Sequence, residues 1–164
     1  MEITIEYLTK DHWLEVSNIY KEGIDTEFAT FQRDIPSYSE WDNNHHQKCR
    51  LVACNGDRVL GFICLSPVSK RESYLGAAEL SLYVGKKYRG IGVGQLLLNS
   101  LVKESEKHGF WTLQAVIVRE NIPSLNLHKK CGFREIGYRE KIAKMKTGIW
   151  HDVILMEKRS SVVN

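Results

Sequence analysis

The sequence has little of what marks several large classes of protein. Only three prolines occur among 164 residues, and there is no internal repeat, low-complexity stretch or linker, so we expect one domain over residues 1–164. No apolar run approaches the ~18 residues that span a membrane. The first residues carry neither the basic segment nor the apolar core of a secretion signal. These absences predict a cytoplasmic protein with no membrane partner.

Cysteine and net charge are also sparse. The four cysteines form no Cys-x-x-Cys motif and no paired spacing, which argues against a zinc ribbon or disulfide scaffold and indicates reduced thiols. His45, His46 and Cys49 lie close together, but no second ligand cluster follows, so we expect no metal. The formal charge of +3 is too small to predict a nucleic-acid partner. The basic run over residues 139–146 is interpreted as a solvated segment.

What is present is an alternation of strand and helix patterns around enough apolar residues for a core. Hydrophobic residues make up 43% of the chain and charged residues 26%, as in ordinary globular proteins. The pattern predicts an α/β sandwich with a mixed sheet, not a doubly wound one. Strands are expected at 3–7, 50–54, 59–65, 77–84, 112–118, 133–138 and 153–158, and helices at 11–20, 37–47, 90–109 and 123–132. Residues 23–36 are expected to form an irregular, partly buried loop.

The segment most informative about chemistry is a strand that runs into a glycine-rich loop and a helix. The strand ends at Val84, and the helix opens in Arg89-Gly90-Ile91-Gly92-Val93-Gly94-Gln95. Glycine lets the backbone approach a ligand closely, and the first N–H groups of a helix bind anions. The simpler interpretation is a tight turn that needs glycine for its conformation alone.

Two familiar phosphate-binding motifs do not fit this loop. A P-loop is excluded because Gly85-Lys86 has neither the upstream glycine nor the following hydroxyl residue. The dinucleotide fingerprint is excluded because the third residue after Gly92 is Gln95 and the third after Gly94 is Leu97. The loop therefore indicates a phosphate-bearing ligand other than NAD or P-loop ATP.

Arg89-x-x-Gly92-x-Gly94 resembles the acyl-CoA pyrophosphate loop of the GNAT acetyltransferases, and the resemblance covers nearly the whole chain. It is closer to one branch, the phosphinothricin (methionine sulfoximine) N-acetyltransferases. The features that carry this closer match are residues 26–31, Lys70-Arg71 with Tyr74, Asn121-x-Pro123-Ser124 with His128 and Gly132-Phe133, and Gly148-x-Trp150-His151-Asp152. The resemblance implies a mostly antiparallel mixed sheet flanked by helices, with splayed central parallel strands. It also implies acetyl-CoA as acetyl donor and a homodimer.

The resemblance assigns the donor to the end of the central strand and the loop after it. The main chain of Leu82 and Val84 is expected to bind the pantetheine arm, with the Val84 N–H polarising the thioester carbonyl. The helix dipole favours the pyrophosphate at the glycine-rich amides. Asn121 resembles the family residue that bonds the CoA arm, and it also suits a helix N-cap before Pro123. The expected donor-binding residues are Leu82, Tyr83, Val84, Arg89, Gly90, Ile91, Gly92, Val93, Gly94, Gln95 and Asn121.

Two residues are candidates for catalysis. An amine arrives as an ammonium and must lose a proton before it attacks a thioester, which suits Glu79 as base, directly or through a water. On the strand pattern alone, a glutamate there is more often a solvated edge residue. His128 stands where many GNAT enzymes have a tyrosine that acts as acid toward the CoA thiolate, and a histidine can do the same near neutral pH. A hydrogen-bonded helix residue is the preferred interpretation of His128.

The candidate acceptor pocket is basic and aromatic. Arg71 offers a planar fork to a carboxylate or phosphinate, so the family pattern favours a small anionic amino acid. The alternative is a solvated turn at Lys70-Arg71 with core aromatics, and for Phe28 and Trp150 taken alone the core is favoured. The expected acceptor-binding residues are Phe28, Phe31, Lys70, Arg71, Tyr74, Trp150 and His151.

These expectations combine into an acetyl-CoA-dependent N-acetyltransferase that acts on the α-amine of a small amino-acid-like acceptor by direct attack in a ternary complex. Phosphinothricin, methionine sulfoximine and methionine sulfone are the acceptor types implied. One alternative keeps the enzyme class with a polyamine or a peptide N-terminus as acceptor. The other is a non-catalytic acyl-CoA-binding sensor.

Overall fold

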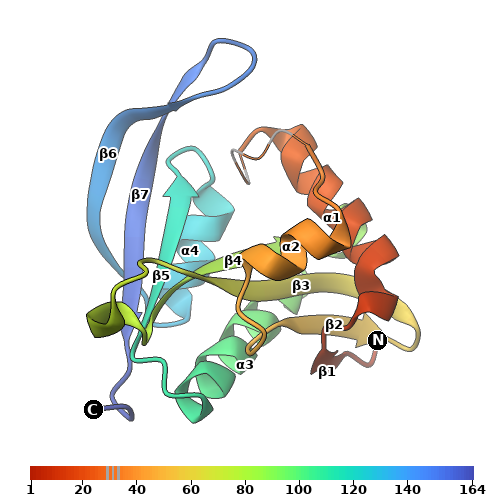
Figure 1. The fold of residues 1–164 in the computed structure, drawn as a ribbon. Helices are drawn as coiled ribbons and strands as arrows, with labels where there is room; N and C mark the ends of the chain where they lie inside the picture. Colours follow the sequence, from red (N-terminus) through yellow and green to blue (C-terminus); the bar gives the residue numbers. More distant parts are fainter. Residues whose placement is uncertain (29, 31, 33) are drawn as a thin grey trace.

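The chain folds around a single mixed β-sheet with helices on both of its faces (Figure 1). The computed structural model describes residues 1–28, 30, 32 and 34–164. Over these residues the strands are β1 (Thr4–Tyr7), β2 (Leu51–Asn55), β3 (Arg58–Pro67), β4 (Ala77–Val84), β5 (Thr112–Val118), β6 (Arg134–Lys144) and β7 (Trp150–Arg159). The helices are α1 (Trp13–Thr26), α2 (Tyr38–Asn44), α3 (Val93–Lys107) and α4 (Ile122–Lys130). None of the helices described has the length and apolar content to cross a bilayer.

The sheet has the order β1-β2-β3-β4-β5-β7-β6, and every described neighbouring pair except β4 and β5 is antiparallel. The parallel pair is short, since it joins only Ala77–Glu79 of β4 to Thr112–Gln114 of β5. Beyond these residues the two strands separate. The expected mixed sheet with splayed central strands is therefore confirmed.

Two apolar clusters hold the helices against the two faces of the sheet. On one face, α3 buries Leu97, Leu98 and Leu101 against sheet residues that include Leu80. On the other face, Val16 of α1 and Trp41 of α2 pack in a cluster with strand residues such as Phe62. Side chains alternate along a strand, so Leu80 faces α3 while Glu79 faces the side of α1 and α2. The splayed strands lie between these two layers.

Two elements differ from the expectation. The expected loop at residues 23–36 is wrong for residues 23–26, because the buried stripe of α1 continues from Val16 and Ile19 to Gly23 and the helix ends only at Thr26. The last two strands are longer than expected, since β6 and β7 pair with each other beyond the rest of the sheet and form a projecting hairpin (Figure 1). Most of the basic run at 139–146 thus lies in β6, where its residues are largely exposed.

Candidate active site

Two adjoining cavities open where β5 separates from β4. The larger, of ≈ 600 Å³, lies beside the N-terminus of α3, and the smaller, of ≈ 370 Å³, extends along β4 to Glu79. The residues that line both are Phe28, Leu82, Tyr83, Asn121 and Ser124. A ligand in the larger cavity can therefore reach the smaller one without crossing a strand.

The strand β4 directs main-chain groups into the gap left by β5. The N–H of Gly85 donates to the carbonyl of Leu60 at 2.8 Å, and hydrogen-bonded and non-bonded pairs alternate along an antiparallel ladder. Val84 and Leu82 are therefore at non-bonded positions toward β3, with their main-chain groups turned toward the side where β5 has diverged. The Val84 carbonyl accepts from Arg89 Nε at 3.3 Å. Because the N–H and the carbonyl of one strand residue point to the same side, the Val84 N–H also faces the cavity.

The N-terminus of α3 carries no side-chain cap. Gly92 is the N-cap residue with φ of 94°, and Gly90 has φ of 78°, so both occupy the left-handed region that favours glycine. A Cβ at either position would meet nothing within 4 Å, while a Cβ at Gly94 would come within 2.9 Å of Leu127 in α4. The first N–H groups of a helix have no intrahelical partner. The arrangement suits an anion held by main-chain amides.

The larger cavity gathers most of the expected donor residues. Ile91 alone among them is not on the walls of either cavity, because its side chain is 52% exposed and points to solvent. Sequence reasoning missed Lys130, which lies at the end of α4 and lines the larger cavity. Together with Arg89, it adds positive charge to a cavity suited to phosphates.

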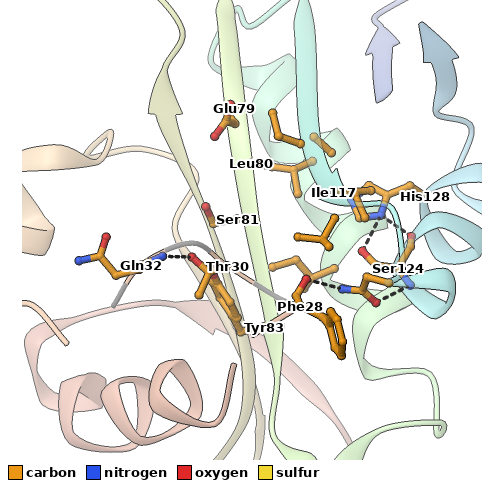
Figure 2. Close-up of a pocket in the computed structure, with 15 residues that line it drawn as sticks. Phe28, Thr30, Gln32, Glu79, Leu80, Ser81, Tyr83, Ile117, Ser124 and His128 are labelled. Carbon is orange, nitrogen blue, oxygen red and sulfur yellow. Dashed lines mark hydrogen bonds between the residues drawn. The ribbon is translucent and has the colours of Figure 1, made fainter. Parts of the chain in front are cut away.

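Glu79 lies at the far end of the smaller cavity. It pairs in register with Gln114 of β5, and Gln114 Nε2 donates to Glu79 Oε1 at 3.0 Å. Within the described part of the chain, Glu79 is the only residue with a formal charge that lines this cavity. In Figure 2, Glu79, Ser81 and Tyr83 follow β4 on one side, and Ser124 and His128 lie across the gap. A lone carboxylate in such a cavity attracts a cationic amine.

His128 is buried, with 2% of its surface exposed, and lines the smaller cavity. Its Nδ1 lies 2.7 Å from the carbonyl oxygen of Ser124, so Nδ1–H is the donor because a carbonyl only accepts. Burial lowers the pKa of His128, and the hydrogen bond to Ser124 opposes this to a smaller extent. Its Nε2 is buried without a hydrogen-bond partner among the described residues. This environment favours a neutral imidazole.

Asn121 connects α4 to the segment after α1. Its Oδ1 accepts from the N–H of Ser124 at 3.4 Å, which confirms the expected N-cap, and its Nδ2 donates to the carbonyl of Phe28 at 3.4 Å. The Phe28 ring meets the ring of His151 edge-on, with centroids 5.9 Å apart. His151 is buried beside Glu120, with Nδ1 and Oε2 3.4 Å apart. Phe28 is 44% exposed, so the interpretation as core is wrong for it.

The structure does not bring the rest of the expected acceptor pocket together. Lys70, Arg71 and Tyr74 are exposed around the 3₁₀ turn Glu72–Tyr74, which directs them to solvent, and none lines either cavity. Trp150 is 51% exposed on β7, with the Lys144 ammonium 5.4 Å from its ring, so core is wrong here too. Phe31 lies outside the described residues. Of the expected acceptor residues in the described part of the chain, only Phe28 therefore lies on the walls of these two cavities.

One polar residue in contact with Glu79 was not predicted from the sequence. Gln114 is a polar side chain in the middle of a largely apolar strand, Thr112–Val118. A polar residue in such a strand needs a hydrogen-bond partner, and this need could have marked Gln114 in the sequence. The sequence pattern does not identify Glu79 as that partner.

Glu6, His12 and Cys54 form a group of potential metal ligands in the described chain, and none of the three lines either cavity. The His12 Nδ1 already accepts from the N–H of Thr9 at 3.0 Å. Burial raises the pKa of Cys54 to about 11, which disfavours the thiolate that binds metals. We assign no metal to this group.

Comparison with known proteins identifies the fold and the donor. Residues 13–133 match the Acetyltransferase (GNAT) family. The chain belongs to this family. Among solved structures, a GNAT phosphinothricin acetyltransferase from Sinorhizobium meliloti in complex with AcCoA has a TM-score of 0.86 at 27% identity, over 97% of this chain and 89% of that one. This GNAT protein is accordingly an acetyltransferase with acetyl-CoA as its donor.

Relatives of known activity are similar over most of their length. A phosphinothricin N-acetyltransferase of Streptomyces viridochromogenes is 32% identical over 84% of this chain and 77% of the relative. An L-methionine sulfoximine/L-methionine sulfone acetyltransferase of Pseudomonas aeruginosa is 31% identical over 85% of this chain and 84% of the relative. A ribosomal-protein-alanine N-acetyltransferase from Brucella melitensis has a TM-score of 0.88 at 26% identity, over 96% of this GNAT chain and 99% of that one. The likeness to the phosphinothricin branch is confirmed.

Proposed function

We propose that this protein transfers acetyl from acetyl-CoA to the α-amine of a small amino-acid-like acceptor of the phosphinothricin, methionine sulfoximine or methionine sulfone type. Transfer is by direct attack in a ternary complex. We further propose a cytoplasmic homodimer. The observation that carries the proposal is the single carboxylate of Glu79 in a small cavity that adjoins the larger cavity beside α3.

The donor is held by the larger cavity. Its pyrophosphate suits the amides at the start of α3, where Gly90 and Gly92 keep the approach open, with positive charge from Arg89 and Lys130. The main chain of Leu82 and Val84 binds the pantetheine amides, and the Val84 N–H donates to the thioester carbonyl oxygen as negative charge develops on it. Acetyl-CoA supplies the activated acyl group.

Glu79 holds the acceptor as an ammonium and removes one proton, directly or through a water. The amine nitrogen then forms a bond to the acetyl carbon, the carbon–sulfur bond breaks, and the electron pair leaves with the CoA sulfur. The nitrogen loses a second proton as the amide forms, and this proton neutralises the CoA thiolate, directly or through water. The proton on Glu79 returns to solvent. Both substrates are bound during this step, so no covalent acyl-enzyme is required.

His128 has a structural role in this proposal. Its Nδ1–H is engaged by the Ser124 carbonyl, and burial lowers its pKa, so it holds no spare proton near neutral pH. A thiolate is a good leaving group and can depart without an acid. His128 instead anchors the helix wall of the smaller cavity.

The acceptor class is supported by the size of the cavity and by the relatives. A volume of ≈ 370 Å³ suits a small molecule, and relatives named for phosphinothricin and methionine sulfoximine are similar over most of the chain. The likeness to a ribosomal-protein-alanine N-acetyltransferase favours a second candidate, the α-amine of a peptide N-terminus. Both candidates present an α-amine to Glu79.

The experiment that tests the proposal measures CoA release from acetyl-CoA with a thiol reagent. The acceptor panel contains phosphinothricin, methionine sulfoximine, methionine sulfone, common amino acids, polyamines and a peptide with N-terminal alanine. We expect release with the first three acceptors and little with the others. Release with the peptide or with polyamines alone overturns the acceptor class. If no acceptor in the panel gives CoA release while acetyl-CoA still binds, the result favours a non-catalytic acyl-CoA-binding sensor.

A further inference from the structure

Gln114 lies beside the proposed base at the last position where β4 and β5 are paired. Glu79 and Gln114 are partners in the parallel register, and no further pair follows before the strands separate in the described chain. On its other side, Gln114 is in register with Glu157 of β7. Because β5 is paired with both neighbours here, the position of the Gln114 side chain is fixed by the sheet.

The contact between the two side chains is a single directed hydrogen bond. The Gln114 amide donates from Nε2 to Glu79 Oε1 at 3.0 Å, and both side chains are partly buried. A hydrogen bond to a charged acceptor is stronger than one between neutral groups. It restricts rotation of the Glu79 carboxylate. Gln114 does not line the cavity, so any effect it has on an acceptor acts through Glu79.

We propose that Gln114 is a positioning residue for the acetyl transfer, which occupies Oε1 of Glu79 and so commits Oε2 to the acceptor amine. The inference rests on the proposed role of Glu79 as base. It predicts that loss of the amide lowers turnover without weakening donor binding. It also explains why a polar residue stands at this position of an apolar strand.

The experiment compares Gln114→Met with the wild type in kcat and in the KM of each substrate. Methionine has a similar length and no donor. We expect kcat to fall about 10-fold, as removal of a charged hydrogen bond implies, with the KM of acetyl-CoA unchanged. Gln114→Glu keeps the length of the side chain but has no N–H to donate to Glu79, so kcat should fall at least as far.

The matched control is Thr112→Val, two residues earlier on the same face of β5 and paired with Ala77. It should keep the wild-type kcat. If Gln114→Met lowers only the thermal stability, or if its kcat matches that of Thr112→Val, the positioning role is overturned. Should Gln114→Met fail to fold, the kcat of Gln114→Glu decides in the same way.

Failure of this inference is distinguishable from failure of the proposed function. If Glu79→Gln keeps the wild-type turnover, the base role fails and the positioning role fails with it. If Glu79→Gln is inactive while Gln114→Met has the wild-type kcat, Glu79 remains the base and Gln114 is only a cross-strand contact.

Discussion

The proposed donor side and the proposed acceptor side of this site are built in different ways. The larger cavity, the proposed donor side, is lined by a nearly continuous segment from Leu82 at the end of β4 to Gln95 in the first turn of α3, and we expect its main-chain groups to bind the donor. The smaller cavity, the proposed acceptor side, is lined by side chains that are far apart in the sequence, among them Phe28, Glu79 and His128. A main-chain site depends on local backbone conformation, which glycines mark in a sequence. A side-chain site depends on how the whole chain packs.

The largest expected effect is on the acceptor side, at Glu79. Glu79→Gln keeps the shape and can still accept from Gln114, but it cannot take a proton. We expect kcat to fall roughly 10²- to 10⁴-fold, the usual contribution of a general base, while acetyl-CoA binding changes little. Steady-state kinetics with calorimetric titration of acetyl-CoA measure both. An equal loss of turnover and donor affinity would place Glu79 in the donor site instead.

The next effect is on the donor side, at the glycine loop. Gly92→Ala puts a side chain at φ of 94°, so the loop must strain or move, and we expect the KM of acetyl-CoA to rise about 10-fold. The KM of the acceptor, at saturating acetyl-CoA, should stay within about twofold of the wild type.

Gly109→Ala is the matched control for the loop. Gly109 follows the C-terminal end of the same helix with φ of 80°, and a Cβ there also meets nothing within 4 Å. The control should lower stability to a similar extent and leave both KM values alone. If it raises the KM of acetyl-CoA as much as Gly92→Ala does, the effect is one of helix stability and not of donor binding.

Arg71 tests how far the acceptor side extends. Because Arg71 is exposed and lines neither cavity, we expect Arg71→Ala to raise the KM of an anionic acceptor less than about 10-fold, with an effect that shrinks as salt is added. The KM of acetyl-CoA should not change. A loss as large as that of Glu79→Gln would restore Arg71 to the centre of the site.

The smallest effect on activity is expected at His128. Burial lowers the pKa of His45, His46 and His128 from 6.5. Between the lowered values and pH 6.5, the unfolded chain therefore binds more protons than the folded one, and the free energy of unfolding rises with pH. Their contribution to stability is complete above about pH 6.5 and is lost as the pH falls below it. His128→Gln should flatten this dependence in urea unfolding between pH 5 and 8. A fall of 100-fold in its kcat would support the general-acid role.

Much of the fold could be read from local signals. The turn between β2 and β3 has Gly56 at φ of 59°, next to the Asn55 and Arg58 pair, as the Asn-Gly motif predicts. Ser37 accepts from the N–H of Glu40 at 3.2 Å, as the capping box predicts. The length of α1 and of the β6–β7 hairpin was missed, because tertiary pairing and not local propensity extends them.

Most of the lining of the larger cavity could be predicted because a family resemblance and a glycine pattern fall on one continuous segment. The lining of the smaller cavity was predicted only in part. Glu79 was expected there, but its contact with Gln114 was not, since the two residues lie 35 positions apart on neighbouring strands. Lys70, Arg71 and Tyr74 were grouped with Phe28 by the family pattern, and the sequence carries no information on which way the turn Glu72–Tyr74 directs them.

The most direct test of the separation between the two sides is titration of acetyl-CoA, without acceptor, into the wild type, Glu79→Gln and Gly92→Ala. The account predicts that Glu79→Gln binds the donor as tightly as the wild type does, within about twofold, and that Gly92→Ala binds it about 10-fold more weakly. Weak binding by Glu79→Gln together with wild-type binding by Gly92→Ala would contradict it.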